Sequence, residues 1–169
     1  MYCEYQQMSD YAKEMRKDAV VQSQRAFKED KTRIFLAIST VYKVAEYARK
    51  EGILSLSRES MFREGRKHVL SIIEEEKNIE IPLKLYLELG LTHVAMGNEV
   101  EVVEELMANR YFANGYVGAD AIIGFIYLLA VTWIQQGICF EYLQDYLISI
   151  IPNWMEEEMN IFFANMQLE

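Results

Sequence analysis

Apolar residues recur at helical spacing along most of this 169-residue chain. Between residues 31 and 50, Ile34, Ile38 and Val41 fall on one helical face, and Gly52 follows where a C-terminal cap belongs. The same pattern predicts helices over approximate ranges 8–28, 31–50, 58–78, 82–96, 99–112, 120–136, 138–151 and 154–166. We therefore expect one all-α domain, residues 1–169, built as a bundle of about eight short to medium helices. Its first 30 residues are expected to form a peripheral N-terminal helix.

The segment 120–136 is hydrophobic nearly all round, which is typical of a helix at the centre of a bundle. Its strongly apolar run, Ala121 to Ile134, is 14 residues long, shorter than a bilayer crossing requires. Gln135 and Gln136 then interrupt the run, and Gly137 is placed to stop the helix. We expect a buried core helix and no membrane insertion.

Leucine occupies every second position from Leu83 to Leu91, a spacing that also fits a strand. Pro82 is well placed in the first turn of a helix, and the apolar pattern continues as far as Gly97. These flanking residues favour a helix over a strand.

Two connections carry specific expectations. Asn98 and Glu101 have the spacing of a capping box at the start of the fifth helix. The connector after Gly52 is predicted to bury its three large apolar side chains, Ile53, Leu54 and Leu56.

The net charge of −9 argues against nucleic acid as a partner, because phosphate binding needs a concentrated basic surface. The charge is also uneven, with a net of +2 over residues 1–85 and −11 over residues 86–169. This pattern favours a solvated acidic surface, with a basic partner or pairing between subunits as the alternative. Adjacent carboxylates, as in Glu104–Glu105 and Glu156–Glu158, point in different directions on a helix, so we predict surface charge there.

No residues have the spacing of a catalytic, cofactor or metal site. Cys3 and Cys139 lie far apart, which favours a reducing cytoplasm over a disulfide-bonded secreted domain. His68 and His93 have no second ligand at metal spacing. The chain also lacks a nucleophile turn and a glycine-rich phosphate loop, so we expect a non-enzyme without cofactor or metal.

Aromatic side chains are abundant, with 11 tyrosines, 8 phenylalanines and 2 tryptophans. Tyr111 and Tyr116 lie near predicted helix ends, where a large side chain with a polar tip suits either a protein interface or the core. We take both as candidate partner-binding residues. The apolar last helix, 154–166, is expected to pack on its own domain, with a homodimer as the alternative.

Two segments resemble the cytoplasmic region of the flagellar motor stator A subunit, the MotA family. In Tyr47–Leu56 a helix ends in a basic pair, followed by glycine and alternating apolar and small residues. In Leu89–Val103 a leucine-rich helix, a glycine turn and a second helix with acidic residues and valines follow each other. The resemblance covers about residues 41–107, under half of the chain.

This resemblance implies a partner and a site. In that family the basic residue that matches Arg49 faces the rotor and pairs with the switch protein, so Arg49 and Lys50 become candidate partner-binding residues. A family glutamate that should match Ser57 is absent here. The four membrane spans and the ion path are absent too. The resemblance therefore implies a soluble bacterial relative that keeps only a binding role.

The favoured hypothesis is thus a non-enzymatic, cytoplasmic helical module that binds a protein partner. The alternative is a small-ligand-binding or regulatory domain whose pocket lies beside helix 120–136, near Tyr127 and Trp133. An enzyme is the least favoured class, since it would need a cleft gathering several of four side chains: His68, His93, Glu88 and Tyr86.

Overall fold

A computed structural model describes residues 8–26, 28–56, 81–138 and 140–166. These residues form seven α-helices and contain no strand, which confirms the predicted all-α bundle. The α-helices are α1 (Asp10–Ser23), α2 (Lys31–Glu51), α4 (Ile81–Ala95), α5 (Val100–Asn114), α6 (Ala119–Gln136), α7 (Phe140–Ile148) and α8 (Glu156–Met166). Three 3-10 turns accompany them: η1 (Lys28–Asp30), η2 (Ile53–Leu56) and η4 (Asn153–Met155). The helix expected over 58–78 lies outside the described residues.

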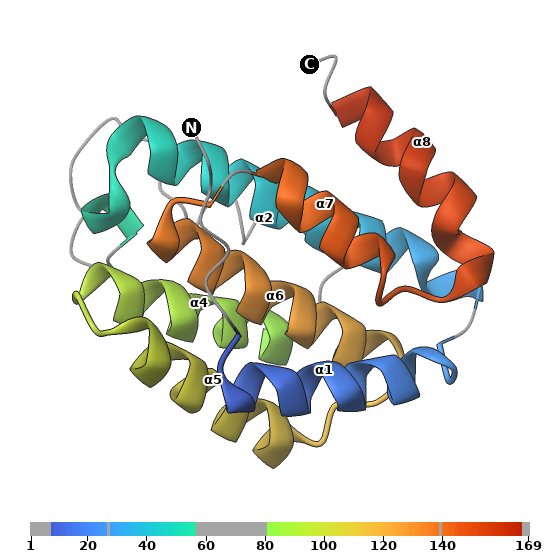
Figure 1. The fold of residues 1–169 in the computed structure, drawn as a ribbon, viewed down its shortest axis with the longest axis horizontal. Helices are drawn as coiled ribbons and strands as arrows, with labels where there is room; N and C mark the ends of the chain where they lie inside the picture. The colour runs from blue at the N-terminus through green and yellow to red at the C-terminus, as the bar shows by residue number, and fades with distance from the viewer. Residues whose placement is uncertain (1–7, 27, 57–80, 139, 167–169) are drawn as a thin grey trace.

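Helix α6 is the centre of the bundle, as its composition predicts. Every side chain from Ala121 to Trp133 is buried. Helices α1, α2, α4, α5 and α7 all pack against it (Figure 1). Its length and composition would also allow a membrane crossing, and 78% of it is buried inside this fold. Gly137, in the left-handed conformation with φ 67°, ends it where expected.

The pattern of buried and exposed leucines along α4 is that of a helix and not that of a strand. Leu83, Leu87 and Leu91 are buried, whereas Leu85 is 56% exposed. Residues four apart share a face in a helix, while a strand would have buried Leu85 together with the others. The buried side of α4 rests on α6 and α5.

The start of α5 differs from the predicted capping box. Its N-cap is Glu99, whose side chain makes no capping hydrogen bond. The Asn98 side chain lies 2.8 Å from Nδ1 of His93 instead, so it joins the end of α4 to the turn. Gln135 on α6 donates to the Asn98 carbonyl oxygen. Asn98 is therefore engaged with His93 and Gln135, and the structure has no capping box at this turn.

Helix α1 buries only part of the face that its bulky residues suggest. Helical spacing predicts an apolar stripe through Met8, Tyr11 and Met15, continued by Val20, Val21 and Phe27. Met15 is buried as expected, but Tyr11, Val20 and Val21 are 40%, 39% and 55% exposed, and Phe27 lies outside the described residues. The inward residues are mostly small, and Met15 is the one large side chain among them; they are Ala12, Met15, Ala19 and Ser23. Small residues let α1 lie close to α6, and this packing outweighs the burial of two valines.

Helix α8 packs back on its own chain. Its Phe162 ring stacks on Phe35 of α2, with centroids 5.1 Å apart. Lys31 pairs with Glu158 at 2.8 Å. The helix forms one rim of the molecule (Figure 1), where Met159 and Phe163 are buried. Self-packing therefore accounts for Met159, Phe162 and Phe163, whereas Ile161 is 56% exposed.

Candidate functional site

The C-terminal end of α2 presents the two basic candidates to solvent. The side chains of Arg49 and Lys50 are 74% and 71% exposed. Both pair with Glu46 on the preceding turn, Arg49 at 2.7 Å and Lys50 at 3.8 Å. Glu51 is exposed beside them, so the local charges balance. This end of α2 is therefore a mixed-charge surface and not a purely basic patch.

The connector that follows α2 turns sharply and exposes apolar side chains. Gly52 has φ 86°, a conformation that other residues rarely adopt, and η2 begins directly after it. Leu56 is buried, but Leu54 is 76% exposed and Ile53 is 37% exposed. The prediction that all three side chains are buried was therefore wrong. A turn with three residues per revolution cannot direct successive side chains to one side.

We call Arg49, Lys50, Ile53 and Leu54 the α2 corner. It combines an exposed leucine and a partly exposed isoleucine with two charged side chains, within six consecutive residues. Protein interfaces commonly have an apolar centre with charged groups at the rim. Sequence periodicity did not reveal this surface, because it cannot tell which apolar residues of a short turn face solvent.

The two tyrosine candidates lie together, Tyr111 in the interior and Tyr116 half-buried beside it. Tyr111 is 1% exposed, and its hydroxyl donates to Asp18 of α1 at 2.8 Å. Its ring meets that of Tyr116 edge-on, with centroids 5.7 Å apart. Burial, and secondarily Asp18, raises the pKa of the Tyr111 hydroxyl. This burial removes Tyr111 from the residues that a partner can touch.

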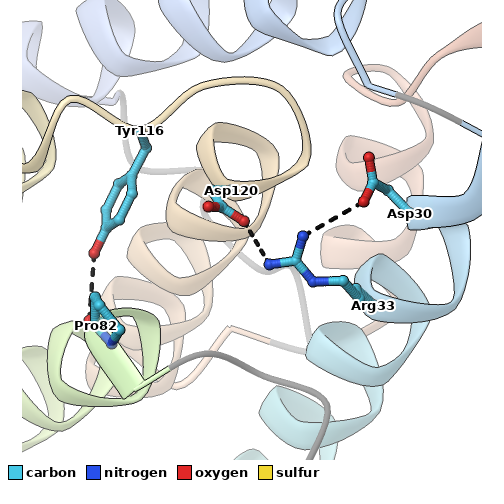
Figure 2. A network of polar contacts seen from close by, with 5 residues as sticks. All are labelled: Asp30, Arg33, Pro82, Tyr116 and Asp120. Carbon is cyan, nitrogen blue, oxygen red and sulfur yellow. Dashed lines mark hydrogen bonds and ion pairs between the residues drawn. The ribbon is translucent and has the colours of Figure 1, made fainter.

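Tyr116 is half-buried beside a network of polar contacts that joins three helix starts (Figure 2). Its hydroxyl donates to the Pro82 carbonyl oxygen at the start of α4, at 3.3 Å. Close by, Arg33 of α2 bonds Asp120 of α6 at 2.5 Å and Asp30 at 3.4 Å. These contacts fix the beginnings of α2, α4 and α6 relative to one another. We assign the network a structural role.

The candidate residues thus fall into two separate places. The tyrosines lie near the start of α6, to which Arg33 is tied through Asp120. Arg49 lies sixteen residues beyond Arg33 on α2, about 24 Å along the helix axis. The α2 corner and the tyrosine pair therefore cannot form one contact surface around a small ligand.

Tyr86 completes the aromatic cluster and carries a hydroxyl that has no hydrogen-bond partner among the described residues. Its ring meets Tyr116 at 5.8 Å, nearly perpendicular. Burial is the main cause that raises the pKa of this hydroxyl well above its ordinary value. A fully buried phenol in this state cannot act as a base near neutral pH.

Of the two histidine candidates, the structure describes His93. His93 is held by Asn98 at the end of α4, two turns beyond Tyr86, whose ring meets that of Tyr116 instead. His68, Cys3 and Cys139 lie outside the described residues. Within the described ranges, no group of three histidine, cysteine or acidic side chains is placed to hold a metal ion.

The two acidic runs differ in their surroundings. Glu156, Glu157 and Glu158 are exposed on α8. In the other run Glu105 is exposed, whereas Glu104 is only 6% exposed, and its burial is the main cause that raises the pKa of its carboxyl. Adjacent carboxylates do point apart, as expected, but the prediction of surface charge was wrong for Glu104.

Comparison with known proteins adds no family to this description. No protein-family model matches the chain, and neither the curated proteins nor the solved structures include a significant match.

Proposed function

We propose that the chain is a non-enzymatic helical module that binds a protein partner through the α2 corner. The observation that carries this proposal is the exposure of Leu54, at 76%, directly beside the exposed cations Arg49 and Lys50. A large apolar side chain held out by a fixed turn loses little conformational freedom on binding, so it suits an anchor residue.

The charges at the α2 corner indicate what its partner offers. Glu46 already pairs with both cations, so long-range attraction contributes little. An apolar pocket for Leu54, with carboxylates at its rim for Arg49, would satisfy both kinds of group. Arg49 is suited to leave Glu46 for a carboxylate of the partner, because its planar guanidinium can bind a carboxylate through two hydrogen bonds.

The resemblance to the stator family supports the same location. The segment Tyr47–Leu56, on which it rests, contains the whole α2 corner. In that family the residue matching Arg49 pairs with the rotor's switch protein, so a flagellar switch or stator protein is the partner we propose. We place the module in the cytoplasm, as a soluble relative of the stator's cytoplasmic region.

A small-ligand-binding or regulatory domain remains the second candidate, on one observation. The Tyr86 hydroxyl is buried beside α6 and lacks a hydrogen-bond partner among the described residues. A ligand with one polar atom and an apolar body would satisfy it. Tyr127 and Trp133, expected to line such a pocket, are 1% and 7% exposed, so a ligand would have to displace packed side chains.

The test of the proposed function is affinity purification of the tagged full chain from its native cells. We expect a flagellar switch or stator protein to co-purify with the wild type and to be lost with both Arg49→Glu and Leu54→Asp. The matched controls, Lys17→Glu and Ile161→Asp, change an exposed cation and a 56% exposed isoleucine elsewhere, and should retain it. The proposal would be contradicted if the partner protein co-purified with both corner variants, or if it were lost only with the control variants.

A further inference from the structure

Helix α8 is attached to the bundle differently from the other described helices. Helices α1, α2, α4, α5 and α7 all pack against the central α6. Helix α8 forms one rim of the molecule (Figure 1), and its most extensive contacts are with its chain neighbours, η4 and α7. Among the described helices it is therefore the one that can leave its place with the least loss of packing.

Two side-chain contacts join α8 to the first turns of α2. The Phe162 ring stacks on Phe35, with centroids 5.1 Å apart and ring planes 12° apart. Lys31 pairs with Glu158 at 2.8 Å, and these side chains are 41% and 47% exposed. An ion pair so open to water contributes little, so the aromatic stack is the stronger of the two contacts. We call Lys31 and Phe35 the α8 seat.

The inward side of the C-terminal segment is apolar. Met155, directly before α8, and Met159 are 0% exposed, and Phe163 is 4% exposed. A released α8 would bring these side chains into water together with Phe162, which is unfavourable. It therefore needs a second surface that matches its apolar side. A second copy of this chain carries such a surface, because it has the same α8 seat.

The connection between α7 and α8 supplies a point at which the chain can swing. Ile150 and Ile151 are 3% and 6% exposed, so they fix the chain to the core after α7. Pro152 follows with φ −58° and ψ 139°, an extended conformation. The Met155 N–H donates to the Pro152 carbonyl oxygen at 2.8 Å. A rotation directly after Ile151 would thus move Pro152, η4 and α8 as one body and leave α7 in place.

We infer that α8 is an exchangeable C-terminal arm, which binds the α8 seat of a second copy of this chain. Two copies that exchange their arms form a dimer. The dimer repeats the Phe35–Phe162 and Lys31–Glu158 contacts between chains, and the main change is at the link after Ile151. Exchange is specific for a second copy because arm and seat already fit one another within one molecule.

Exchange of the arms leaves the α2 corner free. Phe35 lies fourteen residues before Arg49, about 21 Å along the axis of α2. The exchanged dimer would therefore present two α2 corners. A partner with repeated binding sites would bind such a dimer more tightly than it binds the monomer. The exchange itself does not depend on what the α2 corner binds.

Cross-linking of the full chain in a Cys3→Ser, Cys139→Ser background tests the exchange. One chain carries Phe35→Cys, and a second, tagged chain carries Phe162→Cys. After incubation together at high concentration, a short bismaleimide should join the two chains into a mixed product, which is recognised by its mass. A single chain with both cysteines should cross-link within itself in dilute solution.

Asn160→Cys is the matched control for Phe162→Cys. Asn160 is exposed and lies two residues away, about 200° around the helix, so it should give no mixed product above background. Three results would overturn the inference. They are the absence of mixed product while the doubly changed chain cross-links within itself, equal yields from positions 160 and 162, and a doubly changed chain that does not cross-link within itself.

The rate of exchange supplies a second measurement. Phe162→Ala weakens a contact that must break before an arm can move, in the monomer and in the exchanged dimer alike. Dimer isolated by size-exclusion chromatography and then diluted should return to monomer at least about tenfold faster than the wild type. The fraction of dimer at equilibrium should change less than about twofold, because the same contact is lost in both forms. A large change in this fraction with an unchanged rate would indicate contact between closed copies and would contradict exchange.

Discussion

At the residue scale, the aromatic cluster depends on one close approach to the central helix. A Cβ atom at Gly124 would lie 2.9 Å from the Tyr111 ring and 3.3 Å from the Tyr116 ring. The Tyr111 ring cannot easily retreat, because its hydroxyl is bonded to Asp18. The absence of a side chain at Gly124 therefore lets two tyrosines pack on α6.

Gly124→Ala should destabilise the fold by about 1–2 kcal/mol, since overpacking of a core costs more than the helix propensity that alanine adds. Urea unfolding followed by circular dichroism measures this loss. In a Tyr111→Leu background, which removes the ring atoms nearest to the new methyl group, the same change should cost less. An unchanged midpoint for Gly124→Ala alone would show that the rings can move aside.

Two tyrosine-to-phenylalanine changes in the same cluster should have different effects. Tyr86→Phe removes a hydroxyl that is buried without a partner in the described structure, so the stability should stay equal or rise by up to about 1 kcal/mol. Tyr111→Phe breaks the bond to the Asp18 carboxylate and should cost about 1–2 kcal/mol. Urea titration of both variants measures the difference. Equal losses would mean that the Tyr86 hydroxyl is bonded in solution.

At the element scale, ion pairs join the N-terminal half of the chain to the acidic C-terminal half. Arg33 and Asp120 tie the starts of α2 and α6, and their side chains are 25% and 28% exposed. Lys31 and Glu158 tie α2 to α8, with side chains 41% and 47% exposed. At these two points, basic residues of the N-terminal half therefore pair with acidic residues of the C-terminal half of the same molecule.

A double-mutant cycle with Arg33→Met and Asp120→Asn should give a coupling free energy of about 1 kcal/mol, because the pair is partly shielded from water. The matching cycle with Lys31→Met and Glu158→Gln should give less than about 0.5 kcal/mol, because both of its side chains are more exposed. Thermal or urea unfolding of the wild type, the two single variants and the double variant of each cycle gives these values. A larger coupling for the second pair would contradict this ranking.

Helix α1 illustrates where periodicity stops being informative. Val20 and Val21 are exposed, while Ala12, Met15 and Ala19 are buried. A sequence pattern ranks faces by hydrophobicity, whereas packing selects the face that fits the neighbouring surface. The hydrogen bond from the Tyr111 hydroxyl to Asp18 joins segments 93 residues apart, which local spacing cannot predict.

At the scale of the whole molecule, the strongest sequence signal matched the strongest structural feature. The apolar run of residues 120–136 predicted the central helix, and glycine at its end predicted the stop. The candidate site could be predicted less completely from the sequence. Exposure of Arg49 follows from its charge, but the exposure of Leu54 and the burial of Tyr111 depend on tertiary contacts.

The central claim, that the α2 corner binds a protein, can be tested most directly by photo-crosslinking in native cells. A photoreactive amino acid at position 54 should give a covalent adduct with a partner protein, and the adduct should disappear when Arg49→Glu is added. The same amino acid at position 161, an exposed isoleucine on α8, should not give that adduct. Absence of an adduct at position 54, or an identical adduct from both positions, would contradict the claim.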